Sequence, residues 1–122
     1  MYAKSGSLDY GMMQFANMSV RDTQAWSAMV MEYATHGHGS KAISLFEEMK
    51  TTRVWPDEIT FLGLLKACGH TGLVREGYEY FYSMSDKYGI IPGIKHYGCM
   101  VDLLSRAGPL DEAYKFIDGL PL

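Results

Sequence analysis

Two histidines separated by one glycine, His36 and His38, form the residue pair in this 122-residue sequence that most resembles a metal site. Imidazole nitrogens bind zinc well, but a stable zinc site needs three or four protein ligands. The turn around the histidines offers no third ligand, so the sequence predicts no metal there. The two cysteines, Cys68 and Cys99, lie in apolar helical contexts, which is typical of reduced, buried thiols. A disulfide between them would require side chains that face one another.

The glycine between the histidines belongs to a repeated pattern. Gly6, Gly37, Gly72 and Gly108 are separated by 31, 35 and 36 residues. The same three offsets relate three further columns, namely Gly11, Ala42, Gly77 and Ala113; Phe15, Phe46, Phe81 and Ile117; and Met18, Met49, Met84 and Leu120. The later two offsets also relate Trp26, Phe61 and Tyr97. Five columns with shared spacing predict a tandem repeat, and they place the histidines in a turn within one unit.

Each unit is expected to contain two helices joined at its glycine. Apolar residues fall at helical intervals before the glycine, as in Trp26, Val30 and Tyr33, and again after it, as in Ala42 and Phe46. One such pair cannot bury its own apolar face, so neighbouring units must stack to complete the core. We therefore predict an all-α solenoid of helix-turn-helix repeats with about seven or eight helices.

The columns, the ending "LFEEMK…PD" and the alternating unit lengths resemble the pentatricopeptide repeat family. More narrowly, they resemble the plant PLS subgroup, in which short, standard and long motifs alternate. Residues 1–22 resemble part of a short motif, 23–57 a standard motif, 58–93 a long motif and 94–122 a nearly complete short motif. The phrases "ITFLGLLKACGHTGLVREG" and "VDLLSRAGPLDEAYKFI" resemble the last triplet of organellar RNA-editing factors. The resemblance implies a right-handed solenoid, and we expect the chain to be a fragment.

Repeats of this kind read single-stranded RNA at one base per unit. The resemblance implies that the fifth and last residues of a motif read the base, while the second packs against it. The standard motif supplies Ser27 and Asp57 with Gln24 as the packing residue, which resembles the family's guanine-preferring combination. A hydroxyl can donate or accept a hydrogen bond, and a carboxylate can accept one. The sequence thus predicts an RNA-binding segment of an organellar RNA-processing or C-to-U editing factor.

The net charge of −3 argues against an RNA partner only until the charges are placed on faces. Residues four apart share one side of a helix. The fifth, ninth and thirteenth residues of the motifs are therefore expected to line a groove: Ser27, Met31 and Thr35; Leu62, Lys66 and His70; and Gly98, Asp102 and Arg106. Lys4 takes the thirteenth place of the first motif. We predict phosphate contacts from Lys4, Lys66, His70 and Arg106, with Glu47, Glu48 and Glu79 facing outward.

Protein binding is the alternative function, since helical solenoids are general partner scaffolds. Leu62 and Gly93 of the long motif offer no side-chain hydrogen bond, and long motifs of the resembled family dock accessory RNA-editing factor proteins. Exposed repeat ends also predict self-association into a homo-oligomer. No apolar run approaches the roughly 18 residues that a membrane helix needs, so no membrane partner is expected.

The sequence contains no motif that indicates an enzymatic function. Editing factors of the resembled subgroup often end in a zinc deaminase with H-x-E and P-C-x-x-C signatures. None of the four histidines is followed two residues later by glutamate, and C-x-x-C does not occur. We therefore predict no catalytic activity and no cofactor for this chain. The resemblance implies a location in the mitochondrion or chloroplast.

Overall fold

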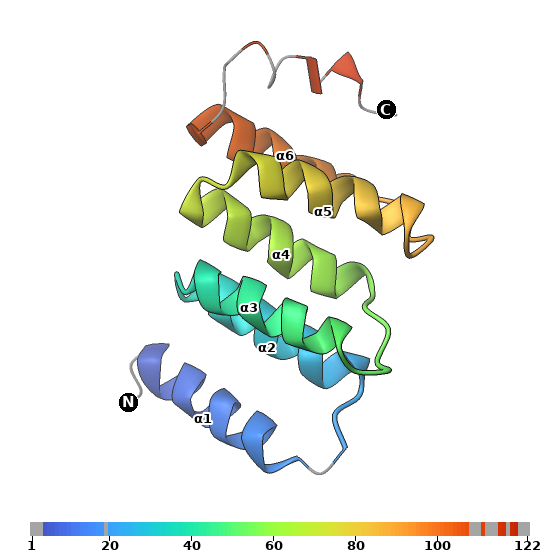
Figure 1. Cartoon of the computed structure of the whole chain (residues 1–122). Helices are drawn as coiled ribbons and strands as arrows, with labels where there is room; N and C mark the ends of the chain where they lie inside the picture. Colours follow the sequence, from blue (N-terminus) through green and yellow to red (C-terminus); the bar gives the residue numbers. More distant parts are fainter. Residues whose placement is uncertain (1–3, 19, 108–110, 112–114, 117, 120–122) are drawn as a thin grey trace.

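Six helices follow one another in the part of the chain that the computed structural model describes, which comprises residues 4–18, 20–107, 111, 115–116 and 118–119, with side chains from Asp9 onward. The helices are α1 (Lys4–Asn17), α2 (Thr23–Thr35), α3 (Gly39–Lys50), α4 (Glu58–Thr71), α5 (Val74–Asp86) and α6 (Ile94–Ala107) (Figure 1). This part contains no strand, and the predicted all-α solenoid class is confirmed. The remaining predicted helix, after Gly108, lies largely outside the described residues.

The helices form two layers. The first helices of the units, α2, α4 and α6, make up what we call the first-helix layer, and the second helices, including α3 and α5, make up the second-helix layer. In the first-helix layer, α4 lies between α2 and α6 and contacts both. In the second-helix layer, α3 contacts α2 and α4, while α5 contacts α4 and α6. Because α2, α4 and α6 begin at Thr23, Glu58 and Ile94, their starts are 35 and 36 residues apart, as the repeat columns are. The stacking order of the helices follows the sequence from α1 at one end to α6 near the other (Figure 1).

Glycines form the turns of the two central units but not of the first. Gly37, between α2 and α3, has a φ of 80°, and Gly72, at the end of α4, has a φ of 72°. These left-handed conformations suit glycine because it has no Cβ. Helix α1 instead continues through Gly6, where the aligned column predicted a turn. Glycine permits a turn without requiring one, so the shared spacing alone could not predict whether the chain turns at Gly6 or stays helical.

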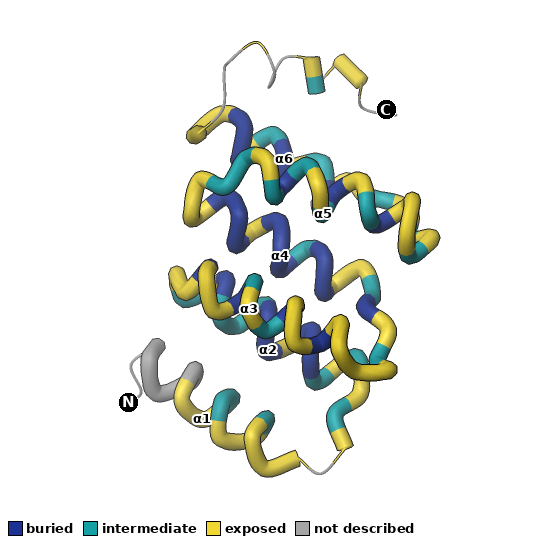
Figure 2. The backbone as a smooth tube through the Cα atoms, in the orientation of Figure 1, coloured by how far each residue is buried: buried dark blue, intermediate teal, exposed yellow. Residues whose placement is uncertain are grey.

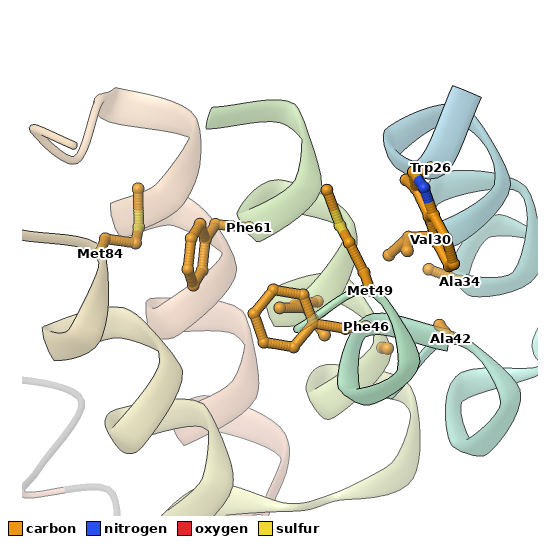
Figure 3. Packing of buried hydrophobic residues seen from close by; sticks show 10 residues of the cluster. Trp26, Val30, Ala34, Ala42, Phe46, Met49, Phe61 and Met84 are labelled. Carbon is orange, nitrogen blue, oxygen red and sulfur yellow. The ribbon is translucent and has the colours of Figure 1, made fainter. Parts of the chain in front are cut away.

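The core forms where the two layers meet. Buried residues concentrate on α2 and α4 and on the inward sides of α3, α5 and α6, whereas the described part of α1 is largely exposed (Figure 2). The main cluster includes Trp26 and Val30 of α2, Phe46 and Met49 of α3, and Phe61 of α4 (Figure 3). The rings of Phe46 and Phe61 meet edge to face, with centroids 5.5 Å apart. Trp26, Phe46, Met49 and Phe61 come from the aligned columns, so the repeat pattern identified most of this cluster.

A close approach of α2 and α4 depends on Gly63. A Cβ added at Gly63 would lie 3.2 Å from the backbone nitrogen of Met31 and 3.3 Å from its Cα. The missing side chain therefore lets the two helix backbones pack closely, which fixes the distance between successive first helices. None of the helices in the described part of the chain is both long and apolar enough to cross a membrane.

Candidate nucleic-acid interface

A groove of about 490 Å³ lies between α4 and α6 on the first-helix layer. We call it the α4–α6 groove. All six residues that the fifth, ninth and thirteenth places of the last two motifs predict are among those that line it: Leu62, Lys66, His70, Gly98, Asp102 and Arg106. Residues four apart lie on one side of each helix, and the parallel stacking of α4 and α6 brings the two sides together. The structure thus brings these six residues together along one groove.

Positive charge exceeds negative charge in the α4–α6 groove. Lys66, Lys95 and Arg106 supply three cations, against the one carboxylate of Asp102. Arg106 Nε lies 3.2 Å from Asp102 Oδ1, and both side chains are more than half exposed. Such a solvated pair is weak and can yield to another anion. Lys66 and Lys95 form no ion pair within the described part of the chain. The groove is thus locally basic in a chain whose net charge is −3.

Lys95 and Cys99 line the α4–α6 groove without having been predicted there. Lys95 is the second residue of its motif, so the four-residue spacing passes over it, although the second place was the one expected to contact a base. Cys99 belongs to no recognisable sequence motif. Burial raises the pKa of its thiol, Lys66 partly opposes this shift, and Asp102 adds to it. Its thiol therefore remains protonated near neutral pH and offers little charge to the groove.

Ser27 and Asp57 are joined by a hydrogen bond, although 30 residues separate them in sequence. The Ser27 hydroxyl lies 2.9 Å from Asp57 Oδ1, to which it can donate. Asp57 is the N-cap of α4, and its Oδ1 also accepts from the backbone N–H groups of Ile59 and Thr60 at 3.1 and 3.0 Å. The last residue of one motif thus caps the first helix of the next, which holds its carboxylate beside α2.

The Ser27 hydroxyl is turned inward, where it has hydrogen-bond partners within the chain. Its side chain contacts both Asp57 and Thr60, and the residue is only 2% exposed. Gln24, one turn earlier on α2, is exposed at the same end of the helix. Within the described chain, the side-chain hydrogen bonds of Asp57 all reach Oδ1, which leaves Oδ2 as an acceptor. The structure thus brings Ser27 and Asp57 together and places Gln24 on the adjoining surface.

Leu62 and Gly93 line a second, more apolar pocket of about 390 Å³. We call it the isoleucine pocket, because Ile59 and Ile94 also line it and are 45% and 69% exposed. Leu62 and Lys95 line both the isoleucine pocket and the α4–α6 groove, so the two hollows adjoin. The two residues predicted for partner docking therefore share one surface.

The other predicted residues lie elsewhere. Lys4 begins α1, and its side chain lies outside the described residues. Glu47, Glu48 and Glu79 are exposed on α3 and α5, as predicted for the second-helix layer. The Nδ1 atom of His36 lies 2.8 Å from the carbonyl oxygen of Glu32, so this ring nitrogen already has a hydrogen-bond partner within the chain. Acidic groups thus gather away from the basic α4–α6 groove.

Sequence models of one repeat family match most of the chain. A model described as the PPR repeat family matches residues 21–70, and one described as the PPR repeat matches residues 59–88 and 95–120. Taken together, these matches span more than half of the chain.

Similar proteins come from plants. A chloroplastic pentatricopeptide repeat-containing protein of Arabidopsis thaliana is 60% identical over 122 residues, which cover 100% of this chain and 20% of that protein. A putative pentatricopeptide repeat-containing protein of the same plant is 48% identical over 123 residues, which cover 100% of this chain and 12% of that protein. The chain thus spans between 12% and 20% of the length of these two relatives.

The fold matches a solved structure. The crystal structure of the pentatricopeptide repeat protein PPR10 from maize superposes with a TM-score of 0.77 and 22% sequence identity, over 94% of this chain and 17% of that one. At this identity the likeness shows a shared helical repeat fold.

Proposed function

Because the chain belongs to the pentatricopeptide repeat family, we propose that it is a segment that binds single-stranded RNA along its first-helix layer. Helical repeats of this kind read one base per unit with two or three side chains. The observation that carries the proposal is the α4–α6 groove, which gathers the predicted residues of two motifs and an excess of cations. The exposed glutamates of α3 and α5 lie in the other, second-helix layer.

Lys66 and Lys95 are the residues that we assign to the RNA phosphates. Both are exposed, line the α4–α6 groove and have no ion pair in the described chain. Each neutralised phosphate releases counterions, so binding should weaken as salt rises. With so few phosphate contacts and one reading pair, this chain by itself should bind RNA in about the micromolar range or more weakly.

For base selection we assign Ser27 and Asp57, with Gln24 packing against the base. The single Ser27 hydroxyl proton has an acceptor inside the chain, either Asp57 Oδ1 or the hydroxyl of Thr60. Because the buried Ser27 hydroxyl is engaged within the chain, the pair presents no donor to a base, and Asp57 Oδ2 is the acceptor that it leaves for one. Guanine carries two neighbouring donors, N1–H and N2–H₂, on its Watson–Crick edge. This matching supports a guanine preference at the standard motif.

An organellar editing role is the finer part of the proposal. The 35- and 36-residue intervals between the starts of the first helices support alternating standard, long and short motifs. One relative is named as chloroplastic, which supports a plant organelle, chloroplast or mitochondrion, as the location. We therefore propose a segment of an organellar RNA-processing or C-to-U editing factor that itself carries no catalytic group.

Charge reversal tests the RNA-binding proposal. Lys66→Glu and Lys95→Glu should each weaken binding to a short single-stranded RNA and should lower the salt slope by about one. Matched controls are Lys41→Glu and Arg75→Glu, which alter exposed cations on α3 and α5. Fluorescence anisotropy at several salt concentrations provides the measurement. Equal losses from the groove variants and the controls would contradict binding along the first-helix layer.

A second candidate function is protein docking at the isoleucine pocket. The exposed side chains of Ile59 and Ile94 beside Leu62 favour an apolar partner surface, such as that of an accessory RNA-editing factor protein. Ile94→Asn should abolish binding of such a protein in isothermal titration while RNA affinity stays within about twofold, because uncharged rim contacts contribute little to RNA binding. An unchanged protein affinity would remove this candidate.

A further inference from the structure

Thr60 connects the two reading residues to the helix that follows them. It is fully buried, and its hydroxyl lies within hydrogen-bond distance of three groups on two residues, Ser27 and Asp57. It can donate to Asp57 Oδ1 at 3.0 Å, accepts from the backbone N–H of Asp57 at 3.1 Å, and contacts the Ser27 hydroxyl. Thr60 is the third residue of the long motif, which begins at Glu58. Its two side-chain partners, Ser27 and Asp57, belong to the standard motif, so Thr60 connects the two motifs.

Part of this arrangement is an ordinary helix cap. Asp57 and Thr60 exchange side-chain and backbone hydrogen bonds as a capping box at the start of α4. A cap alone does not require a hydroxyl on the preceding first helix. The additional contact to Ser27 crosses from α4 to α2, so the cap also fixes the hydroxyl of the reading pair.

The next motif offers an internal comparison. His96 is the third residue of the last motif, and its Nδ1 accepts from the backbone N–H of Gly93 at 2.9 Å, as Thr60 accepts from Asp57. The opposite ring nitrogen, Nε2, lies 2.8 Å from the carbonyl oxygen of Glu58 on α4 and donates to it. Both third residues therefore bridge successive first helices. Only the Thr60 bridge ends on polar side chains that can face a base.

We infer that Thr60 is a specificity-determining positioning residue, which makes the reading site a unit of three side chains drawn from two motifs. This inference rests on the proposed reading role of Ser27 and Asp57. Thr60 does not need to touch the RNA. It keeps the Ser27 proton directed into the chain and holds the Asp57 carboxylate by Oδ1, so that the pair presents no donor to a base.

Removal of the Thr60 hydroxyl should weaken the preference for guanine over the other bases. Ser27 would lose one of its two internal partners and gain freedom to rotate and donate towards the groove. A site that can donate as well as accept no longer disfavours bases with acceptors on their pairing edge, such as adenine and cytosine. Affinity for guanine should change less than the ratio between guanine and the other bases.

The test compares binding of the whole chain to oligouridine RNA that carries one guanine, adenine or cytosine, and to the all-uridine RNA. Thr60→Val removes the hydroxyl at nearly constant shape, and Thr60→Ser keeps it. Wild type and Thr60→Ser should prefer guanine, while in Thr60→Val this preference should fall about fivefold to tenfold. If valine is not accommodated, Thr60→Ala removes the same hydroxyl with less bulk.

His96→Leu is the matched control. It breaks the equivalent bridge in a unit whose reading places hold Leu62 and Gly93, so thermal stability should fall while the base ranking stays unchanged. A guanine preference that survives in the folded Thr60→Val and Thr60→Ala variants would overturn the role of Thr60 and leave the proposed function intact. Wild-type binding without any base preference would instead overturn base reading itself, and the inference with it.

Discussion

At the residue scale, the proposed interface depends on hydrogen-bond groups whose orientation the chain fixes before any ligand arrives. The Asp57 carboxylate is held as a helix cap, and the Ser27 hydroxyl is held against it. Side chains that are already oriented lose less conformational entropy on binding than free ones. A site built in this way can distinguish bases with very few contacts.

Substitution of Ser27 tests the reading pair directly. In Ser27→Asn the side-chain amide adds a donor beside the Asp57 acceptor, so base preference should move from guanine towards uracil, as the family pattern implies. The mismatch with guanine should lower affinity by about 1–3 kcal/mol, the range for a bidentate base contact. Leu62→Ala should leave the ranking unchanged, because neither side chain forms hydrogen bonds. Titrations against RNAs that differ in one nucleotide would show whether Ser27→Asn keeps the original ranking, which would make this motif a spacer.

A buried thiol makes stability depend on pH at the alkaline end. Desolvation, with a smaller contribution from Glu76, raises the pKa of Cys68 from 9.0 to about 12. Between these values the unfolded thiol loses its proton and the folded one keeps it, so the unfolded state binds fewer protons. The free energy of unfolding should therefore be unaffected by this group below about pH 9 and should fall above it. In Cys68→Ala, denaturant titrations should show a shallower fall; an identical slope would contradict the assignment.

At the element scale, two glycines inside first helices have opposite surroundings. Gly63 of α4 faces the backbone of α2, whereas a Cβ at Gly98 of α6 would meet nothing within 4 Å. Gly63→Ala should destabilise the chain by about 1–3 kcal/mol, because the helices must separate to make room. Gly98→Ala should stabilise it by about 0.5–1 kcal/mol through helix propensity. Thermal unfolding of both variants measures the contrast, and similar shifts would refute the close approach of α2 and α4.

Elements were easier to predict than contacts between them. Helical periodicity and the glycine and proline positions identified the paired helices, and spacing by four placed Lys66 and Gly98 in one groove. Periodicity gave no information on how far a helix extends through a tolerated glycine, as at Gly6. It also did not show that Ser27 points inward, because that orientation depends on Thr60, 33 residues away. Lys95 was missed because spacing by four passes over the second residue of a motif, whose place in the groove depends on how α6 packs beside α4.

At the scale of the whole molecule, charge is unevenly distributed over the surface. The first-helix layer holds the basic α4–α6 groove, and the second-helix layer carries the exposed glutamates of α3 and α5. A net charge of −3 therefore describes neither face. An anionic, extended ligand is expected to associate with one side of the molecule only.

The outer face of α1 is apolar and exposed, which predicts self-association of this chain. Tyr10 and Met13 are 65% and 62% exposed. Solenoid repeats normally stack against a neighbour on such a face, so a second copy should cover it at high concentration. Analytical ultracentrifugation should show dimers or larger species for the wild-type chain and a monomer for Met13→Glu. A wild-type monomer at the highest accessible concentration would count against this prediction.

The most direct test of the account is to map RNA contacts on the folded chain by NMR. Backbone amide resonances would be followed while a short guanine-containing single-stranded RNA is added to saturation. We predict shifts that cluster on α2, α4 and α6, strongest around Lys66, Gly98 and Arg106 and around the start of α4 at Asp57, with α3 and α5 nearly unchanged. Shifts confined to α3 and α5, or none at a saturating concentration, would contradict the claim that the first-helix layer is the RNA-binding surface.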